Sequence, residues 1–205
     1  MVLTRIGILG GTFDPVHRGH LEIARRAMDE AELERVIFIP AGQPRLKPGE
    51  PSASPQQRLE MLRLAVDDTS GFEVSDIELR RPGPTLTVET LRELRREFGG
   101  GVELCFILGL DVLARFDQWL EPERVMELAR LLAVSRPGYT GFDWPGFYAR
   151  NPYALDRVTC LDSTAIDVSA SELRQRISTG ASVSGLLPPA VEGYIRDNGL
   201  YVGQR

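Results

Sequence analysis

Apolar residues in this 205-residue chain occur in short runs that alternate with stretches of helical periodicity. The first run, residues 5–10, ends in paired glycines, and residues 19–31 then carry apolar positions at the 3.6-residue period of a helix. A second run, 35–40, is followed by a Pro/Gly-rich loop and by a predicted helix over 55–66 with Ser54 as its N-cap. The chain therefore begins as strand, helix, strand, helix.

The same alternation continues along the rest of the chain. A nearly continuous apolar run over 102–108 is typical of a strand that is buried on both faces of a parallel sheet. The remaining pattern predicts a strand pair within 72–79, a helix over 87–98, a helical stretch over 121–130, a strand over 131–135, an irregular segment over 137–157, a strand over 158–161, and helices over 169–178 and 188–198, the last with Gly199 as its C-cap.

Strands that alternate with helices predict an α/β fold: a Rossmann-like, doubly wound, mostly parallel sheet with helices on both faces. We expect a single domain over residues 1–205, with a small C-terminal helical part at about 168–200. Ligands of such sheets bind beyond the carboxyl ends of the strands. Candidate functional residues are therefore expected in the loops that follow Leu9, Ile39, Leu108 and Val134.

Composition narrows the classes of protein that fit. The net charge of −5 argues against a dedicated nucleic-acid binder, and no apolar run approaches the roughly 20 residues that span a bilayer. Residues 1–5 are too short to be the start of a secretory signal, so a cytoplasmic location is expected. Cys105 and Cys160 lie in apolar, strand-like stretches, which favours two buried free thiols over a disulfide or a metal site.

The first candidate site is the segment 10–20, Gly-Gly-Thr-Phe-Asp-Pro-Val-His-Arg-Gly-His, between the first strand and its helix. Gly10 and Gly11 allow a ligand close to the backbone, and the amides of a helix start favour phosphate. His17 and His20, the two histidines of the chain, share one face of that helix start. A capping His17 with a surface His20 is the plainer interpretation.

Other phosphate and metal motifs fit this segment less well. A zinc pair of the H-x-x-H type needs a third and a fourth ligand, which the sequence does not indicate, and we expect no protein-built metal site. The segment contains neither G-x-x-x-x-G-K-[ST] nor G-x-G-x-x-G. An ordinary P-loop or dinucleotide-binding motif is therefore not supported.

The second candidate site is the segment 168–174, Val-Ser-Ala-Ser-Glu-Leu-Arg. Ser169 followed by Glu172 has the spacing of a capping box, and helix initiation alone would explain those two residues. Helix initiation does not explain Arg174. On a helix it neighbours Ser171 and could offer its guanidinium to the same phosphates as the Ser171 hydroxyl.

With these two motifs, the chain closely resembles the nucleotidyltransferase α/β-phosphodiesterase superfamily, which is marked by H-x-G-H and a late I-S-S/T-T-x-x-R motif. Within it, the whole chain resembles the bacterial nicotinate-nucleotide adenylyltransferases. Further matches are 78–81 with 84–87, 109–111, Trp119, 136–139, and the closing segments 186–189 and 199–201.

The chain departs from the pattern of that family in three motifs. The loop after the second strand has Leu46 in Pro-Arg-Leu-Lys where the family commonly has P-P-H-K/R, and Leu86 stands between two threonines where S/T-Y-T is usual. Val168 and Ser171 stand where Ile and Thr are usual. The first two departures concern acceptor binding, whereas the third is conservative.

The resemblance implies that ATP transfers its adenylyl group to nicotinate mononucleotide, giving deamido-NAD and pyrophosphate in NAD biosynthesis. It implies Mg²⁺ as cofactor with ATP and nucleotides as the binding partners, without nucleic acid or membrane and with a possible homo-oligomer. The implied catalytic residues are His17, His20 and Arg174. The implied ATP-binding residues are Gly10, Gly11, Thr12, Phe13, His17, His20, Ser169, Ser171 and Arg174, and the implied acceptor-binding residues are Lys47, Thr85, Leu86, Thr87, Asp111, Trp119 and Arg136.

Plainer roles stay open for the acceptor-side residues. Trp119 could be a core aromatic, Asp111 could cap the helix after the 102–108 strand, and Lys47 and Arg136 could be solvated loop charges. Two other functions also stay open. One is adenylyl or cytidylyl transfer to another phosphorylated acceptor, such as phosphopantetheine, FMN or nicotinamide mononucleotide. The other is a non-catalytic nucleotide sensor.

Overall fold

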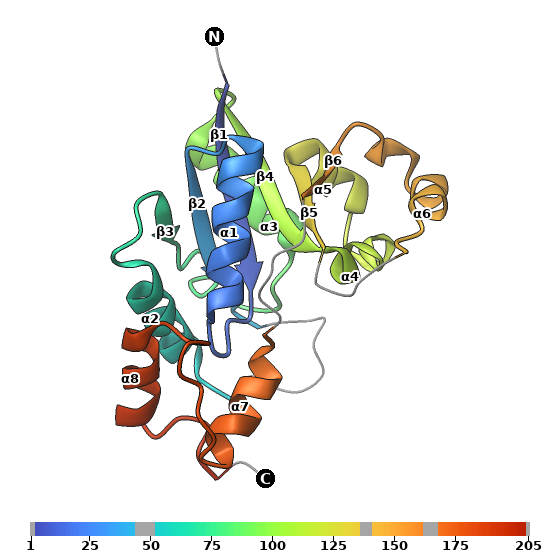
Figure 1. The fold of residues 1–205 in the computed structure, drawn as a ribbon. Coiled ribbons are helices and arrows are strands. Elements are labelled where there is room, and N and C mark those ends of the chain that lie inside the picture. Colours follow the sequence, from blue (N-terminus) through green and yellow to red (C-terminus); the bar gives the residue numbers. More distant parts are fainter. Residues whose placement is uncertain (1–2, 44–51, 136–140, 162–167, 204–205) are drawn as a thin grey trace.

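The computed structural model of the chain describes residues 3–43, 52–135, 141–161 and 168–203 (Figure 1). At its centre is a six-stranded sheet in the order β3-β2-β1-β4-β5-β6, in which all neighbouring pairs are parallel. The chain leaves β1 toward one edge and returns to the other side of β1 with β4, so the predicted doubly wound sheet is confirmed. The strands are β1 Thr4–Gly11, β2 Arg35–Pro40, β3 Phe72–Val74, β4 Val102–Gly109, β5 Arg130–Val134 and β6 Val158–Leu161.

Helices connect the strands and cover both faces of the sheet (Figure 1). They are α1 Arg18–Ala31, α2 Pro55–Val66, α3 Thr87–Phe98, α4 Leu110–Leu113, α5 Pro122–Leu128, α6 Trp144–Arg150, α7 Ala170–Ser178 and α8 Pro189–Asp197, with short 3-10 turns η1 Phe116–Gln118 and η2 Pro152–Ala154.

The two faces of the sheet carry separate apolar clusters because side chains alternate along each strand. On β2, Val36 and Phe38 join the cluster with α1, α2, α7 and α8, whereas Ile37 and Ile39 join the cluster with α3, α4, α5 and α6. Figure 1 shows α1 and α3 on opposite faces of the sheet. Loops rather than helices follow the carboxyl ends of β1 and β2.

Several predicted elements are confirmed with their boundaries. The helix α2 begins after Ser54, whose hydroxyl accepts a hydrogen bond from the Gln57 amide (3.2 Å). The helix α3 has the predicted bounds, and α7 follows Ser169 as its N-cap. Gly199, just beyond α8, has a φ of +59°. This left-handed conformation after a helix end favours glycine.

Two predicted segments are wrong in part. The strand pair expected within 72–79 is a single short strand, β3, because the chain then turns and the Leu79 amide donates to the Asp76 carbonyl (2.9 Å). The segment 137–157, expected to be irregular, contains α6 and η2. Asp143 starts α6 by accepting from the Gly146 amide (3.0 Å), and buried Phe147 joins the apolar cluster that includes residues of α3, α4 and α5.

The cysteine prediction is half right. Neither thiol forms a disulfide, and Cys105, on the central strand β4, is buried. Burial raises the pKa of the Cys105 thiol to about 11. Cys160 is exposed instead of buried, because β6 is an edge strand. In the described part of the chain, no helix is long and apolar enough to cross a membrane.

Candidate active site at the carboxyl edge of the sheet

Parallel pairing places the ends of β1, β2, β4 and β5 at one edge of the sheet. The segment 10–20 follows β1 at this edge, and Asp111 follows β4. Lys47 and Arg136, predicted in the loops after β2 and β5, lie outside the described residues, as does Leu46. Their predicted roles stay predictions.

The two histidines form a stacked pair at the start of α1. Their ring centroids lie 3.7 Å apart at an interplanar angle of 24°. His17 is the buried N-cap, and its backbone N–H donates to His20 Nδ1 (3.3 Å). Because Nδ1 accepts this bond, neutral His20 carries its proton on Nε2, which is then the nitrogen that can donate to a ligand.

Small residues and a strained backbone shape the space around the pair. A Cβ on Gly19 would lie 3.1 Å from His17 Nδ1, so a side chain at this position would press on the His17 ring. Phe13 is a buried non-glycine residue with a φ of +51°, and its ring meets the His20 ring edge to face (4.9 Å between centroids). Strain of this kind is common at functional sites.

The second predicted motif lies next to the first. Ser169 Oγ accepts from the Glu172 amide (3.2 Å), which confirms the expected helix cap. Arg174 Nη2 donates to Ser171 Oγ (3.3 Å), and Arg174 Nη1 donates to the backbone carbonyl of Asp14 (2.7 Å). The structure therefore brings α7 and the loop before α1 together through two residues that lie 160 positions apart. Ser169 and Ser171 are exposed there, while Arg174 is partly buried.

Buried polar residues behind the loop were not predicted from the sequence. Asp14 is 4% exposed, and its Oδ1 accepts from the Tyr201 hydroxyl (2.8 Å). Arg58 is 1% exposed and donates to the carbonyls of Thr12 (2.8 Å) and Ala41 (2.7 Å). Burial, together with the Asp14 carboxylate, raises the pKa of Tyr201 well above its usual value, so this hydroxyl keeps its proton and donates it.

The sequence held weak signals for these residues. Asp14 lies inside the glycine-rich motif, and Tyr201 lies in a closing segment that matches the resembled family. Arg58 precedes Met61 and Leu62 by three and four positions, which places it on the buried face of α2. A charged residue at such a position signals a buried partner.

The predicted acceptor-binding residues Thr85, Leu86 and Thr87 lie in a segment that contacts the loop after β2. The Gly42 amide donates to Thr85 Oγ1 (3.0 Å), and the Thr85 amide donates to the Gln43 carbonyl (2.9 Å). Leu86 is the N-cap of α3 and provides no side-chain cap, while its carbonyl accepts from the amides of Glu89 (3.1 Å) and Thr90 (3.2 Å). This leaves the amides of Thr87 and Val88 at the start of the helix. These amides can receive an anion.

Glu78 supports this loop from the protein interior. It is buried, and it accepts hydrogen bonds from the hydroxyls of Thr90 (2.7 Å) and Thr85. Burial raises the pKa of the Glu78 carboxyl, and the two hydroxyls and Arg81 oppose this shift.

Glu78→Gln should lose less stability than the wild type as the pH rises. A raised folded-state pKa means that the folded protein holds this proton more tightly, so stability declines as pH rises from about 4.5 through the raised pKa, by at most about 1.4 kcal/mol per pH unit. The glutamine variant lacks this component and keeps an acceptor for Thr90. Denaturant unfolding between pH 4.5 and 7.5 measures the difference, and parallel pH curves for the two proteins would contradict it.

Trp119 and Asp111 lie where the chain leaves β4. Trp119 packs on Phe106 (5.9 Å, 86°) and Phe116 (5.2 Å, 45°), as a core aromatic would. Its Nε1 is nevertheless buried without an acceptor among the described residues. A buried indole N–H usually has a partner. Asp111 lies in the first turn of α4, at its negative-charge-favouring end.

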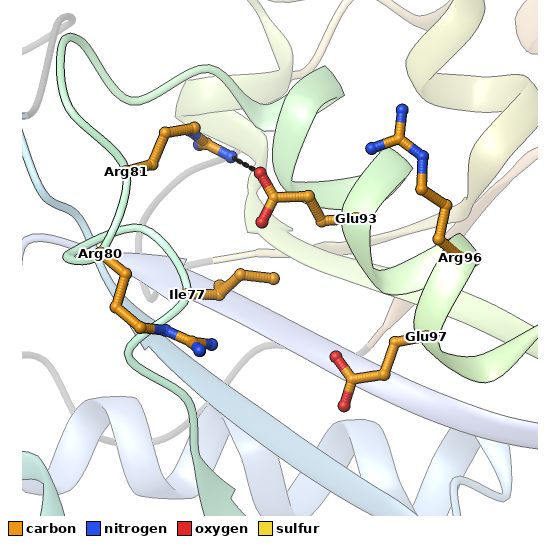
Figure 2. Close-up of a pocket in the computed structure, with 6 residues that line it drawn as sticks. All are labelled: Ile77, Arg80, Arg81, Glu93, Arg96 and Glu97. Atoms are coloured by element: carbon orange, nitrogen blue, oxygen red, sulfur yellow. Dashed lines mark hydrogen bonds and ion pairs between the residues drawn. The ribbon is translucent and has the colours of Figure 1, made fainter.

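A cavity of about 620 Å³ lies outside this site, between α3 and the segment after β3. Figure 2 shows Arg81 of this cavity paired with Glu93 (2.8 Å). Neither histidine lines it, nor does Arg174. Its charges are of both signs, and Arg80 pairs with Asp76 (3.0 Å), so the cavity has no strong preference for an anion. The lining residues are Ile77, Arg80, Arg81, Glu93, Arg96 and Glu97.

The fold and the site define a nucleotidyltransferase class. A family model described as Cytidylyltransferase-like matches residues 8–176, and the chain belongs to this family. It is 43% identical to "Probable nicotinate-nucleotide adenylyltransferase" of Thermomicrobium roseum, with 97% of this chain and 92% of the relative covered. A protein of the same name from Roseiflexus sp. is 44% identical, with 96% and 97% covered. Within the family, the chain therefore belongs with the nicotinate-nucleotide adenylyltransferases.

Solved structures agree on the fold. The chain is similar to Plasmodium falciparum nicotinic acid mononucleotide adenylyltransferase complexed with NaAD, with a TM-score of 0.79, 18% identity and 97% of each chain covered. The structure of the same Plasmodium enzyme complexed with APC gives a TM-score of 0.76 at 17% identity, again over 97% of each chain. At these identities the likeness concerns the fold alone.

Proposed function

We propose that the protein transfers the adenylyl group of ATP to nicotinate mononucleotide, giving deamido-NAD and pyrophosphate. A 5'-phosphate oxygen of the acceptor forms a bond to the α-phosphorus of ATP, and the bond between this phosphorus and the bridging oxygen to the β-phosphate breaks. Pyrophosphate leaves with that electron pair. The reaction needs alignment and charge stabilisation rather than a covalent enzyme intermediate.

One observation carries the proposal: Arg174 on α7 is hydrogen-bonded to Asp14 in the loop that leads to the two histidines. This contact holds α7 beside the loop that leads into α1, which suits a site where the starts of both helices face one triphosphate. The relatives named as nicotinate-nucleotide adenylyltransferases support the choice of acceptor.

On the ATP side, we assign His20 Nε2 to donate to the phosphates and His17 to hold and orient the His20 ring. The backbone of Gly10, Gly11, Thr12 and Phe13 contacts the nucleotide. The hydroxyls of Ser169 and Ser171 and the guanidinium of Arg174 bind the triphosphate, because a planar guanidinium matches two phosphate oxygens at once.

Mg²⁺ fits this site as part of the ATP complex. Among the described residues, no group of three or more His, Cys, Asp or Glu side chains is placed to hold a metal ion. Phosphate oxygens and water would then supply most of the ligands, as is usual for this ion. When bound, Mg²⁺ neutralises phosphate charge during transfer.

On the acceptor side, Trp119 supplies flat apolar contact to the pyridine ring, and the first-turn amides of α3 bind its carboxylate. The amides of Thr85, Glu89 and Thr90 already donate to backbone carbonyls, so the donors are the amides of Thr87 and Val88. We also assign Lys47, Asp111 and Arg136 to the acceptor. Leu86 contributes its backbone, since its aliphatic side chain cannot replace the family's aromatic stacking.

Wild-type protein should prefer nicotinate over nicotinamide mononucleotide by about 10- to 100-fold in kcat/KM. An uncharged amide would leave a donor unsatisfied at the helix start, which costs about 1 to 3 kcal/mol. Trp119→Ala should weaken both acceptors by a similar factor, because stacking does not distinguish a carboxylate from an amide. Pyrophosphate release from ATP with each acceptor measures both ratios.

The same assay decides between the alternatives. Phosphopantetheine, FMN and a phosphorylated alcohol with CTP belong in the panel. Equal use of the two mononucleotides would refute the donor argument, and ATP binding without pyrophosphate release with any acceptor would indicate a sensor. If Trp119→Ala used the two mononucleotides with equal kcat/KM, the indole would be the source of the selectivity.

A further inference from the structure

Tyr201 connects the C-terminal segment to the candidate nucleotide loop. It lies beyond α8, its side chain is 2% exposed, and its φ is +64°, which is unusual for a residue with a side chain. Its hydroxyl donates to Asp14 Oδ1 (2.8 Å) across 187 positions of sequence. None of the roles assigned above to ATP or acceptor contacts uses this hydroxyl.

The Asp14 carboxylate is held from several sides. Its Oδ1 also accepts from the Ala53 amide (3.0 Å), and its Oδ2 accepts from the Ser52 amide (2.8 Å). The backbone carbonyl of the same residue accepts from Arg174 Nη1 (2.7 Å). The side chain therefore fixes the point at which the phosphate-binding arginine rests on the loop.

Arg58 holds the loop two residues before Asp14. Its buried guanidinium donates to the carbonyl of Thr12, in the nucleotide loop, and to the carbonyl of Ala41, after β2. Its charge also lies close enough to Asp14 and Tyr201 to interact with them. We name Asp14, Arg58 and Tyr201 the buried clamp.

We propose that Tyr201 is a positioning residue for ATP, which acts through Asp14 to hold the loop of residues 10–14 and Arg174 in the geometry that receives the triphosphate. The inference rests on the proposed function for the identity of the ligand. Without the hydroxyl, Asp14 Oδ1 keeps one donor of two, and the carboxylate can turn away from its place. The loop amides and Arg174 are then no longer held in place by a fixed Asp14.

The test compares Tyr201→Phe with Tyr153→Phe. Tyr153 is a matched control, because its hydroxyl also donates one 2.8 Å hydrogen bond, to Asn151 Oδ1, beside α6. We expect Tyr201→Phe to raise the KM for ATP and the Kd for Mg-ATP about 10-fold, as loss of a hydrogen bond to a charged group does, and to change the KM for the acceptor less than about 2-fold. Tyr153→Phe should leave all three within about 2-fold.

A double-mutant cycle with Asp14→Asn identifies the route. If Tyr201 acts through the Asp14 carboxylate, Tyr201→Phe should have a much smaller effect on ATP binding in the Asp14→Asn background than in wild type. Equal Kd values for Mg-ATP in wild type and Tyr201→Phe would overturn the proposal, as would a full effect in the Asp14→Asn background. Wild-type protein that binds Mg-ATP but adenylylates no acceptor would instead refute the proposed reaction, and the binding comparison would still test the clamp.

Discussion

His20→Ala should lower kcat by about 100- to 1000-fold, which is the scale for loss of one preorganised donor to a developing charge. The Nδ1 atom of His20 accepts the His17 amide, so the opposite nitrogen is the one that can donate to the phosphates. Alanine removes both functions. Pyrophosphate release at saturating ATP and acceptor measures kcat, and circular dichroism checks that the variant folds.

His20→Gln separates the chemistry from the helix start. Glutamine at the third helical position can still accept the N-cap amide, as in an ordinary capping box, but it has no imidazole. We expect His20→Gln to melt close to wild type and to lose nearly as much turnover as His20→Ala. Turnover near the wild-type value in either folded variant would refute the assignment of His20 to catalysis.

Arg174→Lys should lower kcat/KM for ATP by about 10- to 100-fold. The guanidinium binds the Asp14 carbonyl with Nη1 and Ser171 Oγ with Nη2, and it keeps a planar edge for phosphate. An ammonium is a single point charge that cannot make these contacts together. Steady-state kinetics with varied ATP measure the change.

Arg176→Lys is the matched control for Arg174→Lys. Arg176 lies on the same helix, but its guanidinium pairs with Glu172 (2.7 Å) at the exposed surface. Exposed ion pairs of this kind contribute little to the free energy of unfolding, so we expect Arg176→Lys to have kinetic constants and stability close to wild type. If both lysine substitutions changed the kinetics equally, the assignment of Arg174 to phosphate binding would be refuted.

The sequence was most informative where local rules and tertiary structure agree. The start of α2 could be predicted because Ser54 and Pro55 are local start signals, and the structure adds Gln57 as the partner in a capping box. The apolar run of β4 predicted a central strand for the same reason. The pairing of the two site segments followed from their shared affinity for phosphate, and the Arg174 contact with Asp14 is consistent with it.

The rest depends on contacts that no local pattern encodes. The buried clamp joins residues from three distant segments, so the partner of Arg58 could not be identified from the periodicity of α2. The exposure of Cys160 depends on β6 being an edge strand, which strand order decides. The helix α6 was missed because glycine, proline and aromatics in its segment favour irregular structure when read locally.

The central position of β1 has a consequence for how the protein is made. The ribosome releases β1 before β4, yet Thr4 pairs with Val102 on β4, and the hydroxyl that holds Asp14 lies 187 positions after it. Contacts between such distant segments form slowly, because a long loop must close before they can form. A nascent chain can therefore expose residues 10–14 well before Arg174 and Tyr201 are made, and we expect nucleotide binding to begin only after Tyr201 has left the ribosome.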